Sequence, residues 1–336
     1  LQMTRFRNVA VMSMALHAVA FAPLAIKKKN GLHSPVLEHL FAKVAAPPNF
    51  TPPEPKPLTV TSIDQLPSLI SGSIALALRL LSSVFVLGWT PRLSLDKPVD
   101  NEYSIMLGPF LFRDTSSVLA QATRPAQPPI LYEYEGSPFC RKVREVAQVL
   151  DLTIEMRPCP GARQGFAAEL KGRSGAMTVP YLADPNTGTE MFESEDIIDY
   201  LVSTYGPPAE SFDSKALWPM RDGPFLLPSA TFATLVRGLA GSQRQSNARR
   251  DNEEMQSLEL WGYEASPFVK PVREKLCALC LPHRVVACSR GSANRDALIA
   301  RTGRQFQVPF LVDPNTGVEM FESAEIVKYL DAVYTE

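Results

Sequence analysis

The chain has 336 residues, which is long enough for about two domains of ordinary size with additional segments. Hydrophobic residues make up 45% and charged residues 21%, as in an ordinary globular protein. The net charge of -1 does not favour nucleic acid as a partner. Five cysteines and four histidines are too few for a disulfide scaffold or a histidine-rich metal site, so we expect no metal.

The amino-terminal residues have the pattern of a targeting sequence. Arg5 and Arg7 precede a mostly apolar run over residues 9–16, and Ala18-Val19-Ala20 is a small-x-small cleavage pattern. Phe21-Ala22-Pro23 follows directly. This arrangement resembles the two-part import sequences of algae with complex plastids, which implies a chloroplast or plastid location. A plain secretory signal is the alternative.

A proline-rich and then a hydrophobic segment lead into the rest of the chain. Residues 47–57 hold six prolines and predict an extended, unpacked spacer. This spacer is the last part of the segment 1–58, which consists of the targeting sequence and the spacer. Residues 66–89 are apolar enough to cross a bilayer, but a central Arg79 costs at least about 2.5 kcal/mol on insertion scales. We therefore prefer a helix packed on the domains or lying on a membrane surface. The lead-in 59–128 is expected to be helical and then irregular, with one short hairpin.

The region 129–206 predicts a compact set of alternating strands and helices. Ser137 suits a helix cap and Pro138 the first helical position, directly after a short strand. Ser194 suits the cap of a last helix. The predicted order is β-α-β-α-β-β-α, with strands at 129–134, 153–156, 181–184 and 190–192 and helices after Ser137, at 162–172 and after Ser194.

The region 257–336 repeats this pattern after a linker at 207–256. Residues 131–205 and 260–334 share 30 identities in 75 positions without a gap, at an offset of 129. This is an internal duplication. In the linker we expect a helix at 229–239 and a polar, mobile stretch at 240–254.

Short motifs recur in both copies at the same offset. Ser137-Pro138-Phe139 returns as Ser266-Pro267-Phe268, Val179-Pro180 as Val308-Pro309, and Glu193-Ser194 as Glu322-Ser323. With the element order, these motifs resemble the thioredoxin fold, and more narrowly glutaredoxins and the amino-terminal domain of glutathione S-transferases. The tandem proteins of plant and algal plastids are similar in arrangement. The resemblance implies an α/β protein with two tandem thioredoxin-like domains after a helical lead-in.

The resemblance also implies glutathione as ligand or co-substrate. Pro180 and Pro309 match the family's cis-proline, and the preceding Val179 and Val308 expose backbone groups that pair with the cysteinyl part. Glu193 and Ser194, like Glu322 and Ser323, match the pair that holds the γ-glutamyl end. A glutamate suits an ammonium group, and a hydroxyl at a helix N-terminus suits a carboxylate. The second site is expected to be competent in shape but degenerate in chemistry.

The thiol chemistry of glutaredoxins is altered in this chain. Ser137 and Ser266 stand where the family's attacking cysteine lies, and only Cys140 keeps the second cysteine. Dithiol exchange by the usual route is therefore unavailable. Ser137 could donate a hydrogen bond to a glutathione thiolate, or it could only cap the helix. Cys140 could pair with Cys159 or be glutathionylated, or both could be structural thiols.

Basic residues follow each Ser-Pro turn and leave two interpretations open. Near the first turn we expect Arg141, Lys142 and Arg144, with Arg157 and Arg163. Near the second turn we expect Lys270, Arg273, Arg284, Arg290 and Arg295. They would suit an anionic tripeptide, or they could form a solvated helix face.

We expect a plastid glutathione-binding protein of the transferase or glutaredoxin class, with weak or specialised thiol chemistry in the first domain at Ser137 or Cys140. It would act as a glutathione transferase or a glutathione-dependent thiol oxidoreductase, if it is an enzyme. The alternative is a non-enzymatic module that docks on a thylakoid protein or a membrane surface. No large helical domain follows either repeat within this sequence, which favours the alternative.

Overall fold

The computed structural model of the protein describes residues 44–56, 63–96, 104–208 and 224–336. The predicted targeting pattern in residues 1–23 lies outside these residues.

The first repeat folds in the predicted order of elements. β4 and β5 run parallel, whereas β6 pairs antiparallel with β4, and β7 with β6. Helix α2 begins at Pro138 and turns Val143, Val146 and Leu150 into the core, because these residues recur at helical spacing. The elements are β4 (Ile130–Glu133), α2 (Pro138–Val149), β5 (Ile154–Pro158), α3 (Ala167–Ser174), β6 (Tyr181–Asp184), β7 (Thr189–Met191) and α4 (Ser194–Tyr205).

The second repeat has the same arrangement. β8 and β9 run parallel, and β10 and β11 extend the sheet antiparallel. The peptide bonds Val179-Pro180 and Val308-Pro309 are both cis. The elements are β8 (Leu258–Gly262), α6 (Val269–Ala278), β9 (His283–Ala287), α7 (Asn294–Thr302), β10 (Phe310–Asp313), β11 (Val318–Phe321) and α8 (Ser323–Tyr334). The predicted order is therefore confirmed in both repeats.

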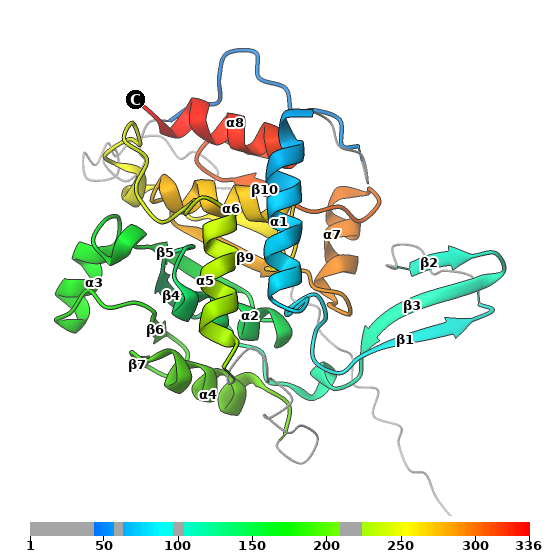
Figure 1. Ribbon diagram of the computed structural model, residues 1–336. Helices are drawn as coiled ribbons and strands as arrows, with labels where there is room; N and C mark the ends of the chain where they lie inside the picture. Colours follow the sequence, from blue (N-terminus) through cyan, green and yellow to red (C-terminus); the bar gives the residue numbers. More distant parts are fainter. Residues whose placement is uncertain (1–43, 57–62, 97–103, 209–223) are drawn as a thin grey trace, which may run out of the picture. The chain divides into compact units, whose positions relative to one another are not determined.

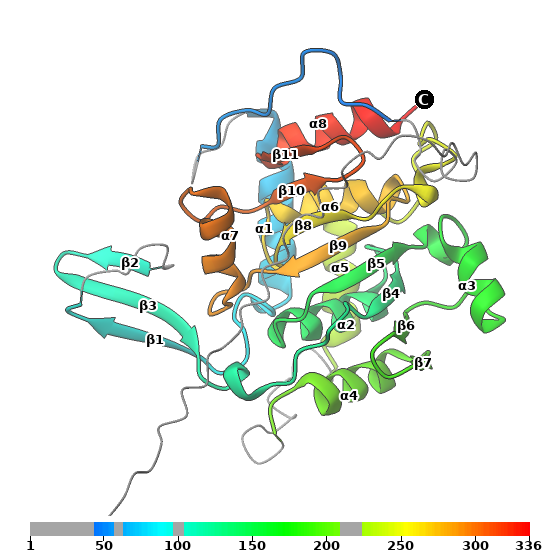
Figure 2. The ribbon, with the colours of Figure 1, turned by 180° about the vertical axis from the view of Figure 1, so that it is seen from behind.

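The two repeats share one eight-stranded sheet, with the order β11-β10-β8-β9-β5-β4-β6-β7 (Figures 1 and 2). They meet where β5 and β9 pair antiparallel, with Glu155 opposite Arg284. These two residues are equivalent under the offset, since 155 + 129 = 284. The neighbouring pairs, Ile154 with Val285 and Met156 with His283, exchange under the same operation. The junction therefore has two-fold symmetry, as an isologous contact between two copies would have.

The lead-in is helical only at its start. Helix α1 (Leu66–Leu78) packs beside α5 (Leu226–Val236), and a three-stranded antiparallel sheet follows α1 (Figure 1). Its strands are β1 (Trp89–Ser94), β2 (Ser104–Leu107) and β3 (Phe110–Ser116). The predicted hairpin is present as β2 and β3. The third strand, β1, was not predicted, because it contains Pro91 and is mostly exposed, so it lacks an apolar-polar alternation. Within the described residues, every helix is too short or too polar to span a bilayer.

Two segments that were predicted to be unpacked or mobile are packed on the second repeat. Phe50, in the proline-rich segment, lies on Tyr329 with ring centroids 5.1 Å apart. Asn252, in the polar stretch, is fully buried and donates hydrogen bonds to the carbonyls of Leu279 and Tyr334. Both predictions are wrong, because they rested on average composition, whereas particular residues of each segment pack on the second repeat.

Candidate functional site

A pocket of about 440 Å³ opens in the first repeat beside the Ser-Pro turn. Three loops line it: the turn after β4, the 3-10 helix after β5 and the residues before the cis-proline. Ser137 and Val179, two of the residues singled out in the sequence, both line this pocket. The lining residues are Tyr134, Ser137, Pro138, Phe139, Ala162, Arg163, Met177, Thr178 and Val179.

Ser137 caps helix α2. Its hydroxyl accepts a hydrogen bond from the backbone N–H of Cys140 at 3.2 Å, and its backbone is extended, as a cap requires. The hydroxyl proton is not used in this bond, and the side chains of Tyr134 and Cys140 also lie within hydrogen-bond reach of the hydroxyl. Ser266 caps the equivalent turn by accepting from the N–H of Val269 at 3.3 Å. The capping role is therefore present in both repeats, and it does not prevent Ser137 from serving a ligand.

Cys140 lies on the inner side of α2 and does not line the pocket. Its side chain is 0% exposed, and burial, followed by the charge of Glu133, raises its pKa to about 12. Burial is also the main reason why the pKa of Cys159 is raised, and the Cys140 sulfur adds to this rise. Both thiols are free and protonated at neutral pH in this arrangement. Among the described residues, no group of His, Cys, Asp and Glu side chains has the arrangement of a metal site.

Glu193 and Ser194 lie directly after β7, at the start of helix α4. Glu193 is exposed, whereas Ser194 is buried as the first helical residue. The backbone of Glu193 has a φ of 63°, and that of the equivalent Glu322 a φ of 74°. A non-glycine residue in this region costs on the order of 1–3 kcal/mol and is found most often at functional sites. The same backbone conformation therefore recurs at the start of the last helix in both repeats.

In the second repeat, an arginine lies beside two residues that are equivalent to lining residues of the first-repeat pocket. Tyr263 and Phe306 are equivalent to Tyr134 and Met177, which line the pocket of the first repeat. The guanidinium of Arg295 lies 4.3 Å from the ring centroid of Phe306 and 5.7 Å from that of Tyr263. It also donates to the carbonyls of Cys288 and Ser289.

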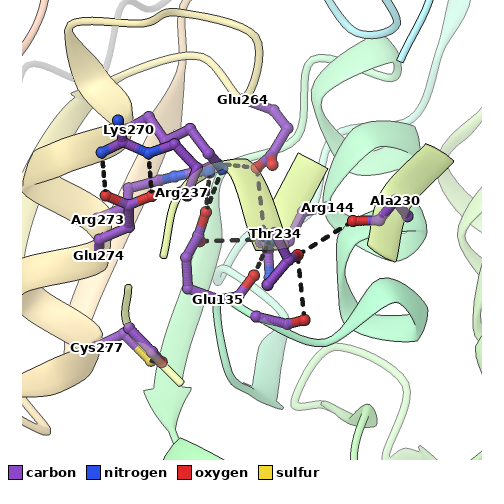
Figure 3. A network of polar contacts seen from close by, with 12 residues as sticks. Glu135, Arg144, Ala230, Thr234, Arg237, Glu264, Lys270, Arg273, Glu274 and Cys277 are labelled. Atoms are coloured by element: carbon purple, nitrogen blue, oxygen red, sulfur yellow. Dashed lines mark hydrogen bonds and ion pairs between the residues drawn. The ribbon is translucent and has the colours of Figure 1, made fainter. Parts of the chain in front are cut away.

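The basic residues after the two turns are neither solvated nor directed at the pocket. Arg144 forms an ion pair with Glu133. Arg144 and Arg273 each form ion pairs with both Glu135 and Glu264 (Figure 3). Each arginine therefore pairs with a glutamate of the other repeat. Burial disfavours the charge of Glu135, but the surrounding cations outweigh this effect and hold its pKa well below the usual value. Both interpretations of these basic residues are wrong for Arg144 and Arg273, which join the repeats instead.

The sequence reasoning missed four pocket residues: Tyr134, Ala162, Met177 and Thr178. Tyr134 stands three residues before Ser137 and recurs as Tyr263, and that recurrence could have drawn attention to it. Arg163 was expected near the site only as part of a general basic cluster, and Met177 is replaced by Phe306 in the second repeat, so no recurrence marks it.

Two stretches of the chain match one family of protein domains. Residues 131–209 and 260–336 each match the glutathione S-transferase, N-terminal domain. The fold and these two matches therefore show a thioredoxin-like protein that contains two tandem glutathione S-transferase N-terminal domains.

Among solved structures, a Bombyx mori glutathione transferase in complex with GTT is 27% identical to the chain. The match covers 27% of this chain and 42% of that chain, with a TM-score of 0.23. The matched part thus spans less than half of that transferase. No curated protein sequence matches the chain.

Proposed function

We propose that the first repeat binds glutathione and that the protein is a glutathione-binding protein of the transferase class. The observation that carries this proposal is the pocket between the Ser137 turn and Val179, because these are the segments that the resemblance assigns to the cysteinyl part of the ligand. The two matches to the glutathione S-transferase N-terminal domain support the same class of ligand.

The groups around the pocket suggest an orientation for the tripeptide. The thiol would lie beside Ser137 and Phe139, with the backbone of Val179 pairing with the cysteinyl unit and Pro180 fixing that backbone. The γ-glutamyl end would lie at the exposed Glu193, which suits an ammonium group, and at the start of α4 with Ser194, which suits a carboxylate. Arg163 would provide positive charge for a carboxylate of the ligand.

Non-covalent binding fits the arrangement of these groups better than disulfide exchange does. Cys140 is buried and protonated, so it is a poor nucleophile. Ser137 lines the pocket and retains a hydroxyl proton that could stabilise a glutathione thiolate. If the protein is an enzyme, we propose a transferase reaction that uses this hydrogen bond.

A calorimetric titration of the full chain with glutathione tests the proposal. Glu193→Ala removes the partner of the ligand's ammonium group. We expect affinity to fall roughly tenfold or more, since a hydrogen bond to a charged group contributes about 1.5–3 kcal/mol. Glu322→Ala is the matched control and should leave the affinity unchanged. Absence of binding to the wild-type chain would contradict the proposal.

A second candidate function, docking on an apolar partner, is favoured by the outward face of α1 and α5. Neither helix contains a charged residue. Ile70 is 58% exposed and Phe232 59% exposed, and apolar patches of this kind mark interaction surfaces. The exposed apolar residues of the two helices are Leu66, Ile70, Ile74, Leu78, Leu227, Phe232, Leu235 and Val236.

We propose a membrane surface, such as that of thylakoids, as the partner of this face. Flotation of the full chain with galactolipid vesicles tests this role. The double variant Ile70→Asp with Ile74→Asp should stay in the soluble fraction, while the wild type floats. Leu93→Asp on β1, which is also exposed, is the control and should float like the wild type. Failure of the wild type to float would exclude the lipid partner.

We also propose a plastid location, on the basis of the pattern in residues 5–23. Expression of the full chain with a carboxyl-terminal fluorescent tag in an alga with a complex plastid tests this location. Fluorescence in the secretory pathway alone would contradict it.

A further inference from the structure

The equivalent glutamates of the two repeats lie in opposite environments. Glu193 is exposed, whereas Glu322 is only 6% exposed. One carboxylate oxygen of Glu322 accepts a hydrogen bond from the backbone N–H of Lys56 at 2.7 Å and another from the side-chain amide of Gln307 at 2.8 Å. The carboxylate that matches the γ-glutamyl-binding position is therefore already satisfied by a segment from far away in the chain.

The segment that reaches Glu322 is anchored over several residues. Figures 1 and 2 show residues 44–56 running over α8 towards α7. Phe50 packs on Tyr329, and Val44 contacts the core of the second repeat. Glu54 pairs with Arg304 at 2.9 Å, but both side chains are exposed, at 80% and 48%, so this pair contributes little. The ring contact and the Lys56 N–H are therefore the main anchors.

The composition of this segment suits binding in an extended form. Residues 51–56 read Thr-Pro-Pro-Glu-Pro-Lys, and the three prolines have no N–H to leave unsatisfied. Proline also restricts the unbound chain to extended conformations, so less conformational entropy is lost on docking. A peptide of this kind needs few polar partners, and Glu322 supplies one for Lys56.

We propose that the second repeat is a binding site for an extended proline-rich peptide, occupied by residues 50–56 of the same chain, and that glutathione binds only in the first repeat. The backbone N–H of Lys56 bonds to Glu322, and the guanidinium of Arg295 lies against the ring of Phe306, the equivalent of the pocket residue Met177. The peptide site stands on these contacts alone. The statement about glutathione rests on the proposed function.

Hydrogen-deuterium exchange of the full chain tests the peptide site without glutathione. Residues 44–56 should be protected in the wild type, and Phe50→Ala should make their amides exchange on the order of tenfold faster, because local opening no longer breaks the ring contact. Glu322→Gln should accelerate exchange at Lys56, while the matched variant Glu193→Gln should not. Exchange of residues 44–56 in the wild type at the rate of an unstructured peptide would overturn the proposal.

A peptide added in trans gives an independent measurement. The double variant Phe50→Ala with Glu54→Lys should release the segment and expose the region 304–323. A synthetic peptide of residues 44–56 should then restore protection of that region, and a peptide of scrambled order should not. Restoration by both peptides alike, or by neither, would contradict a specific site.

The stoichiometry of glutathione binding completes the test. We expect one glutathione per wild-type chain. Two per chain, with residues 44–56 still protected, would overturn the claim that the second repeat is closed. Absence of any glutathione binding would overturn the proposed function of the first repeat, while protection of residues 44–56 would still support the peptide site.

Discussion

Cys140 and the other four thiols of the chain are all buried. Burial raises the pKa of Cys140 and of Cys280 to about 12, so neither provides appreciable thiolate at neutral pH. We expect Ellman's reagent to label none of the thiols within minutes in the folded protein at pH 8, and all five in urea. One rapidly labelled thiol in the folded protein, lost in Cys140→Ser, would instead support a redox role for Cys140.

His283 is a buried titratable group whose equivalent in the first repeat is Ile154. Burial lowers its pKa to about 4, compared with about 6.5 for a free histidine. Between these values the unfolded chain binds a proton that the folded chain does not. The free energy of unfolding therefore decreases through this group as the pH falls from about 6.5 to about 4.

Replacement of His283 isolates this contribution. His283→Gln keeps an N–H that can reach the carbonyl of Leu281, which the ring contacts at 2.9 Å. Urea denaturation between pH 7 and pH 4 should show a smaller loss of stability in the variant than in the wild type. Asp151, whose pKa burial raises to about 6, acts in the opposite direction in both proteins and cancels in the comparison. Identical pH profiles would show that His283 does not contribute.

At the scale of elements, α1 and α5 are held at their ends in the same way. Arg79 follows α1 and pairs with Glu145 at 2.6 Å, and Arg237 follows α5 and pairs with Glu274 at 2.5 Å. Glu145 and Glu274 are equivalent, since 145 + 129 = 274. Each repeat therefore holds its own preceding helix through a buried ion pair.

Removal of one member of such a pair should be costly. Arg79→Met leaves Glu145 buried without its cation, and we expect a loss of about 3–5 kcal/mol in the free energy of unfolding, measured by urea denaturation. Adding Glu145→Gln should recover part of this loss. Arg173→Met, which breaks an exposed pair with Glu190, is the control and should cost less than about 1 kcal/mol. Equal effects of the two arginine variants would refute the role assigned to Arg79.

The elements that could be predicted from sequence are those with local signals. Ser137 and Pro138 mark the start of α2 wherever that helix packs, and the internal repeat doubles the evidence for each motif. The contact between Lys56 and Glu322 could not be predicted, because the donor is the backbone N–H of a residue 266 positions away. A backbone group has no side chain that could signal its partner in the sequence. The pairing of Arg144 with Glu264 was missed for a related reason, since it depends on how the repeats meet.

At the scale of the whole molecule, the continuous sheet should make both repeats unfold together. Strands β5 and β9 would be unpaired edges if the repeats were separate, and the buried ion pairs would lose their partners. We expect one transition in urea, with coincident far-ultraviolet circular dichroism and tryptophan fluorescence, and with a midpoint that does not depend on protein concentration. Two separated transitions would show that the repeats are independent folding units.

The symmetric pairing of β5 with β9 has a consequence for how the two halves can differ. In a dimer of identical chains, every substitution appears on both sides of the two-fold axis. A change that covers the binding position of one chain therefore covers that of the other chain too. Here the second repeat is part of the same chain as the first, so the two repeats associate without a second molecule. The junction keeps its symmetry around Glu155 and Arg284, whereas Glu193 is open and Glu322 is covered. Fusion of the two repeats therefore allows them to differ: the first can keep Glu193 open to a ligand, while the second binds residues 50–56 of its own chain.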